Sequence, residues 1–162
     1  MKKISYLLIL LIFFTNISSC AGYKPIFSSS NLELKIADYS ISGDKKLGNQ
    51  IYSRLYNLSR SNKNNSESRN LYILINVSQN KNATAKDSAG KILGYRINLS
   101  TTITVIDLTL EDEILNETLS FGLTYKVQDQ FSETVKLENQ TIENLIDKTY
   151  QDLIIKLTEN LL

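Results

Sequence analysis

The sequence predicts an α/β (α+β) domain with a single four-stranded mixed sheet and two helices packed on one face, in the order β-α-β-β-β-α. Apolar and polar residues alternate in four segments, as in half-buried strands. In two others, apolar residues recur every three or four positions, as in amphipathic helices. The first helical segment falls between two strands, which suggests a crossover connection. The alternation leaves one sheet face polar, so that face should meet water or a partner, and Leu74 and Ile106 on it favour a partner.

The first half of the domain is predicted to hold one strand and one helix. Leu34 and Ile36 alternate with charged residues in the strand at 32–38. Asp44 is placed to cap a helix over about 45–60. Four residues form its apolar stripe: Leu47, Ile51, Leu55 and Leu58. The polar run that follows, 60–70, is predicted to be a mobile loop.

The second half is predicted to hold three strands and a long helix. The strands cover residues 71–77, about 95–105 and 115–127. Small and polar residues predict a long connection at 79–93, and the acidic segment 111–113 predicts a turn. The helix covers about 132–161, with Ser132 as its cap. Its apolar stripe needs a sheet to pack on, because such helices gain most of their stability from tertiary contacts.

Residues 1–19 have the features of a bacterial lipoprotein signal peptide. Two lysines precede an apolar run at 6–14, which is well short of the roughly 20 residues needed to span a bilayer. Ile17-Ser18-Ser19 then precedes Cys20, the only cysteine in the chain. This resembles a lipobox, which implies cleavage before Cys20, a diacylglycerol on its sulfur and a fatty acyl chain on its amino group. The alternative is a plain secretion signal with an incidental thiol.

Cleavage before Cys20 would leave a lipidated tether at 20–31 and a domain at 32–162. The removed segment carries two of the 18 basic residues and none of the 17 acidic ones, so the net charge changes from +1 to −1. A nucleic-acid partner is not expected at this balance, because such proteins present a strongly basic face. The N-terminal lipid alone would hold the protein to a membrane.

Few catalytic groups are available in this sequence. The chain has no histidine, which excludes histidine-based triads and histidine-containing metal sites. It also lacks the glycine-rich motifs that bind phosphates or present a nucleophilic serine. We therefore expect no enzyme, no cofactor and no metal site. A carboxylate-dependent hydrolase is the alternative, and it predicts two carboxylates converging in a pocket.

One basic cluster is predicted at an end of the sheet. A three-residue loop at 111–113 pairs Asn98 with Lys126 and puts Arg96 one step along the same polar face. The predicted connection enters the same end with three lysines: Lys81, Lys86 and Lys91. Like charges this close are unfavourable, so a bound polyanion would explain them. The alternative is that strand-end lysines extend into solvent.

Three segments carry a resemblance to a known family. They are Cys20-Ala21-Gly22-Tyr23-Lys24-Pro25-Ile26-Phe27, Tyr95-Arg96 and Ser120-Phe121-Gly122-Leu123-Thr124-Tyr125. With the lipobox and the order of elements, they resemble the LPS-assembly lipoprotein LptE family, in its alphaproteobacterial type. Ala21 is an insertion relative to the Cys-Gly usual in that type.

The resemblance implies an outer-membrane lipoprotein that plugs an LptD-like β-barrel, assists its assembly and helps deliver lipopolysaccharide to the outer leaflet. Lipid A carries phosphates that basic side chains can contact. The expected lipopolysaccharide-binding residues are Lys81, Lys86, Lys91, Arg96 and Lys126. The alternative is a lipoprotein accessory subunit of another envelope complex, for secretion or barrel assembly, that uses the same polar face.

Overall fold

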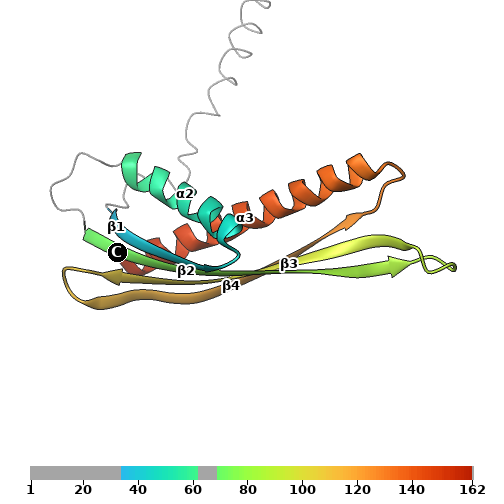
Figure 1. Ribbon diagram of the computed structural model, residues 1–162. Helices are drawn as coiled ribbons and strands as arrows, with labels where there is room; N and C mark the ends of the chain where they lie inside the picture. Colours follow the sequence, from blue (N-terminus) through green and yellow to red (C-terminus); the bar gives the residue numbers. More distant parts are fainter. Residues whose placement is uncertain (1–33, 62–68, 162) are drawn as a thin grey trace, which may run out of the picture.

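The computed structural model describes residues 34–61 and 69–161 (Figure 1). The predicted signal peptide, the lipidation of Cys20, the tether at 20–31 and most of the predicted loop at 60–70 lie outside these residues. They stay predictions.

The described residues confirm the predicted fold class and order of elements. The elements are β1 (Leu34–Gly43), α2 (Lys45–Ser61), β2 (Arg69–Lys86), β3 (Ile92–Asp107), β4 (Asp112–Lys126) and α3 (Phe131–Leu161). The strands form one mixed sheet in the order β1-β2-β3-β4, with β1 parallel to β2 and the other neighbours antiparallel. Both helices lie on the same face of this sheet (Figure 1).

The crossover from β1 to β2 begins with a sharp turn into α2. Gly43 has a φ of 74°, and the Asp44 N–H donates to the Val77 carbonyl oxygen at 2.7 Å. The Asp44 carboxylate then accepts from the Leu47 N–H at 3.1 Å, which confirms the predicted cap. The turn is thereby fixed against the middle of β2.

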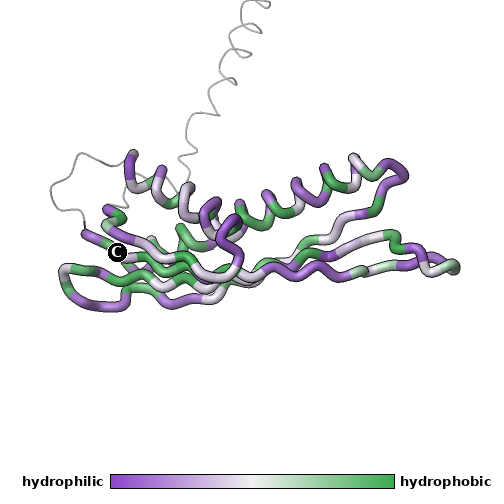
Figure 2. The backbone as a smooth tube through the Cα atoms, in the orientation of Figure 1, coloured by the Kyte–Doolittle hydropathy of each residue, from purple (hydrophilic) through white to green (hydrophobic). Residues whose placement is uncertain are grey.

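The predicted long connection at 79–93 is wrong. β2 continues to Lys86 and β3 starts at Ile92, so only residues 87–91 turn. The Asp87 carboxylate accepts from the Ala89 and Lys91 N–H groups, both at 2.9 Å. β2 is mostly hydrophilic in this part (Figure 2), so alternation could not indicate a strand there. Backbone pairing with β3 forms it instead.

These extra residues create a three-stranded part of the sheet. β1 ends opposite Val77, so the strands beyond that point have no β1 neighbour. We call this part the sheet extension: residues 78–86 of β2, 92–100 of β3 and 120–126 of β4. In Figure 1 it projects to the right beyond α2, beneath the N-terminal half of α3.

The predicted register between β3 and β4 is also wrong. Asn98 lies opposite Gly122 instead of Lys126. The buried Asp107 carboxylate accepts from the Thr109 and Leu110 N–H groups, at 2.7 and 3.2 Å, so the turn starts earlier than predicted. A bulge in β4 after this turn supplies one extra residue, which returns the apolar side chains to the helix-facing side.

The core lies between the sheet and the two helices. All four residues of the predicted apolar stripe of α2 belong to this core. The other core residues are helix-facing residues of β2, β3 and β4 and sheet-facing residues of α3. α3 starts at Phe131, one residue before the predicted Ser132 cap. Its first turn is instead tied by Thr134, whose hydroxyl accepts from the Gln128 N–H at 2.8 Å.

Thr101 offers a test of this core. Its side chain is fully buried on β3, and its hydroxyl has no hydrogen-bond partner among the described residues. We expect Thr101→Val to stabilise the protein by about 1 kcal/mol, because it removes a desolvated, unpaired hydroxyl at nearly constant volume. Urea unfolding of both proteins measures the difference. A loss of stability would mean that the hydroxyl is hydrogen-bonded.

Candidate binding surface

The sheet face opposite the helices is polar and uncovered among the described residues. Across β3 and β4, the Ser100 and Ser120 hydroxyls lie 3.0 Å apart and the Thr102 and Thr118 hydroxyls 2.9 Å apart. We call this surface the bare face, and its polar residues include Asn76, Ser78, Asn80, Asn82, Arg96, Asn98, Ser100, Thr102, Thr104, Asn116, Thr118, Ser120, Thr124 and Lys126. Leu74 and Ile106, both half-buried, lie on the same face nearer the other end of the sheet. The bare face therefore offers hydroxyl and amide groups in fixed rows.

Arg96 is held in one orientation on the bare face. Its Nε donates to the Asn98 Oδ1 at 2.9 Å. A Cβ at Gly122, on the neighbouring strand, would come within 2.4 Å of that oxygen and 2.6 Å of the Arg96 Nη2. The glycine therefore leaves the space that the paired side chains occupy. The terminal nitrogens of Arg96 keep donors for a ligand, since guanidinium has five N–H groups.

A shallow depression of about 530 Å³ surrounds this pair. Its lining is Ser78, Gln79, Asn80, Arg96, Asn98, Leu99, Ser100, Ser120, Phe121 and Gly122. Arg96 is the one charged residue in this lining. A ligand bound there would find one cation among many hydroxyl and amide groups, which suits an anion flanked by hydroxyls.

The structure brings together only part of the predicted basic cluster. Arg96 lies opposite Thr124, and Lys126 lies one step further on the same strand, so both are on the bare face. Lys86 and Lys91 flank the turn at the exposed tip of the sheet extension. Lys81 lies opposite Ile97 and faces α3. Lipopolysaccharide binding by any of them stays a prediction.

Lys81 forms a clamp between the sheet extension and α3. Its Nζ lies 2.6 Å from the Glu138 Oε2, which also accepts from the Tyr125 hydroxyl at 2.9 Å. The same Nζ is 4.4 Å from the centre of the Tyr95 ring and 5.6 Å from that of Tyr125. We call these four residues the Lys81 clamp. The sequence prediction missed it because β2 was expected to end before Lys81. Positions 77, 79 and 81 nevertheless fall on the same face of a continuous strand.

The clamp changes the pKa of its members. Burial alone would raise the pKa of Glu138, but hydrogen bonds from Lys81 and Tyr125, with the charge of Lys81, lower it. Burial alone would lower the pKa of Lys81, but the hydrogen bonds and charges of Glu138 and Tyr125 raise it. Burial and the bond to Glu138 raise the pKa of Tyr125 against the opposing effect of Lys81. The charged pair is thus the favoured state.

The sign of these shifts predicts a pH dependence of stability. A lowered carboxyl pKa contributes stability above its ordinary value of 4.5, and the contribution is lost as pH falls through the lowered pKa. A raised lysine pKa contributes below 10.5, and this is lost as pH rises through the raised value. We expect Glu138→Gln to lower the urea midpoint at pH 7 and to lower it less at pH 3. Glu159→Gln is the control, and an equal loss at both pH values would contradict the prediction.

Residues 34–61 and 69–161 contain no group of three or more acidic, cysteine or histidine residues arranged to hold a metal ion. None of their helices combines the length and apolar character required to cross a membrane.

Comparison with known proteins shows the fold. No protein-family model and no curated protein sequence matches the chain. A minor lipoprotein from Acinetobacter baumannii is 15% identical, with a TM-score of 0.53 over 78% of this chain and 94% of that one. Lipoprotein B from Nitrosomonas europaea is 14% identical, with a TM-score of 0.53 over 82% and 88%. A candidate lipoprotein from Caulobacter crescentus is 13% identical, with a TM-score of 0.53 over 76% and 89%. The chain therefore shares the fold of these bacterial lipoproteins.

Proposed function

We propose that the protein is an LptE-like, lipid-anchored subunit of the lipopolysaccharide translocon in the outer membrane. In this role it is not an enzyme. It plugs an LptD-like β-barrel, assists assembly of that barrel and helps deliver lipopolysaccharide to the outer leaflet. Cys20 carries the lipid.

The observation that carries this proposal is the bare face. It runs along three strands, is polar along most of its length and presents Arg96 in a fixed orientation beside a shallow depression. A surface of this kind suits a wet, hydrogen-bonded contact better than a hydrophobic one. Lipopolysaccharide combines phosphates with sugar hydroxyls, which matches one guanidinium among serine and asparagine side chains.

Two other observations support the same role. The solved structures that share the fold are bacterial lipoproteins, in agreement with the lipobox at Ile17–Cys20. The segment Cys20 to Phe27 resembles the start of mature alphaproteobacterial LptE proteins. The alternative role, an accessory lipoprotein of a secretion or barrel-assembly complex, would use the same bare face with a different partner.

Affinity purification from native membranes tests the proposal. The tagged protein should be isolated in mild detergent with its N-terminal signal and Cys20 intact. We expect an LptD-like barrel to co-purify, together with lipopolysaccharide. Recovery of a secretion or barrel-assembly complex would favour the alternative role. Recovery of no outer-membrane protein would rule out both.

A further inference from the structure

Helix α3 meets the sheet through two chemically different halves. From Leu145 onward, its four buried apolar side chains are at most 2% exposed: Leu145, Ile146, Leu153 and Leu157. Before Leu145, its two buried side chains are Thr134 and Thr141, and its apolar contacts with the core are the partly buried Leu137 and Ile142. Apolar burial provides most of the packing free energy, so the N-terminal half of α3 is held less firmly by packing than the C-terminal half.

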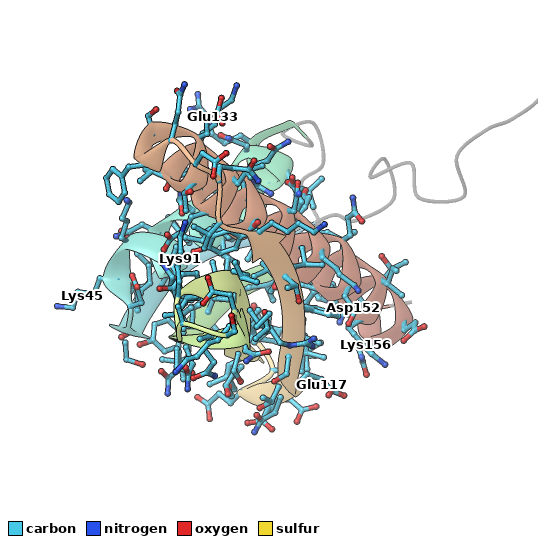
Figure 3. All side chains as sticks on the ribbon, turned by 90° about the vertical axis from the view of Figure 1, so that its right-hand side faces the viewer. Lys45, Lys91, Glu117, Glu133, Asp152 and Lys156 are labelled. Atoms are coloured by element: carbon cyan, nitrogen blue, oxygen red, sulfur yellow. The ribbon has the colours of Figure 1, made fainter. Side chains whose placement is uncertain are left out.

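The sheet extension is the surface that this weaker half covers. Among the strands, α2 contacts mainly β1 and β2, and β1 ends opposite Val77, before the extension begins. α3 contacts mainly β4. Figure 3 looks onto this end, with Glu133 on α3 at the top and Lys91 on the sheet extension below it. Within the described residues, the N-terminal half of α3 is therefore the element that covers the helix-facing side of the extension.

Polar contacts join the two surfaces. The Lys81 clamp connects β2, β4 and α3, and the Lys81 and Glu138 side chains remain 34% and 25% exposed. The Thr134 hydroxyl connects the start of α3 to Gln128. Water can replace the partners in partly exposed contacts of this kind. They therefore hold the N-terminal half of α3 on the sheet less firmly than buried apolar packing would.

The outer side of the same helix segment carries two exposed apolar side chains among its polar ones. Phe131 is 82% exposed and Val135, one turn later, is 37% exposed. Leu137 is partly buried against the core, but the buried side chains of this segment are threonines. The packed state of the segment therefore gains less apolar burial than that of the C-terminal half.

We infer that residues 131–141 form a lid on the sheet extension, closed by the Lys81 clamp and able to open while the rest of the domain stays folded. Opening uncovers helix-facing side chains of β3 and β4, among them Tyr95, Leu123 and Tyr125. The C-terminal half of α3 keeps its place because its leucines and isoleucine remain in the core. The lid is independent of the ligand assigned to the bare face.

Hydrogen–deuterium exchange of the full chain in detergent micelles tests the lid. We expect backbone amides at 137–141 to exchange about 100-fold faster than those at 146–157, since local opening needs less free energy than global unfolding. Glu138→Gln should make exchange at 137–141 about tenfold faster than in the natural protein and leave exchange at 146–157 unchanged. Lys81→Met, a change on β2, should have the same effect on α3.

Glu159→Gln is the matched control, because it removes a carboxylate of α3 that pairs within the helix with Lys156. It should leave exchange at 137–141 unchanged. Equal acceleration of both halves by Glu138→Gln would mean that the domain opens as one unit. Acceleration confined to 131–134, or absent in Lys81→Met, would mean that the helix end merely frays. Either result overturns the inference.

Discussion

Replacing Gly43 by alanine should destabilise the protein by about 3 kcal/mol, which corresponds to a fall of roughly 10 °C in Tm for a domain of this size. The residue has a φ of 74°, which is costly for any residue with a side chain. An alanine Cβ would also come within 2.1 Å of the Val77 carbonyl oxygen. That oxygen accepts the Asp44 N–H at the start of α2, so the clash displaces the turn that joins β1, α2 and β2.

Gly90→Ala is the matched control for this prediction. Gly90 has a φ of 84°, but a Cβ there would meet nothing within 4 Å. We expect a loss of about 1 kcal/mol from the left-handed backbone alone. Thermal unfolding of the three proteins gives the comparison. If Gly43→Ala costs no more than Gly90→Ala, the contact with Val77 does not constrain the turn.

Reversing the charges of Arg96 and Lys126 should weaken binding of lipopolysaccharide by roughly 100-fold, because each charge-assisted hydrogen bond contributes about 1.5–3 kcal/mol. Both residues lie on the bare face, one step apart on neighbouring strands. Their side chains are exposed, so the double variant Arg96→Glu/Lys126→Glu should fold. Titration with lipopolysaccharide micelles measures the loss.

Lys45→Glu is the control for charge reversal. Lys45 lies at the start of α2 and projects into solvent away from the sheet (Figure 3). A negative charge there is favourable for the helix, so the variant should be as stable as the natural protein. It should also bind lipopolysaccharide normally. Unchanged binding by the double variant would exclude Arg96 and Lys126 as contacts.

The order of elements and the position of the core could be predicted because both depend on local periodicity. The stripe of α2 and the alternation in β3 and β4 are properties of residues close in sequence. The cap at Asp44 was predictable for the same reason, since it involves residues three positions apart. These signals need no knowledge of which strand lies beside which.

The sheet extension and the register depend on contacts that alternation does not encode. Residues 78–86 form a strand because β3 offers a backbone to pair with, although few of their side chains are apolar. The turn after β3 starts early because the Asp107 carboxylate binds two backbone N–H groups, and a bulge then offsets β4. The end of β2 and the register of β4 were both mispredicted at the same end of the sheet. For this reason the prediction put Lys81 in one basic cluster with Arg96.

The contact between Arg96 and Asn98 was only partly predictable from the sequence. They stand two positions apart, so a strand puts them on one face, and Gly122 lies within the clearest strand. A glycine in a strand often indicates close approach of another group. The register was needed to identify that group as the Arg96 guanidinium.

Site-specific photo-crosslinking in living cells tests most directly whether the bare face is the surface that meets the proposed barrel partner. A photoreactive residue at Thr102, on the bare face, is compared with one at Gln151, an exposed position on α3. We expect Thr102 to crosslink to an LptD-like outer-membrane barrel and Gln151 to give no such product. Crosslinking to the barrel from Gln151 but not from Thr102 would contradict the assignment of the bare face.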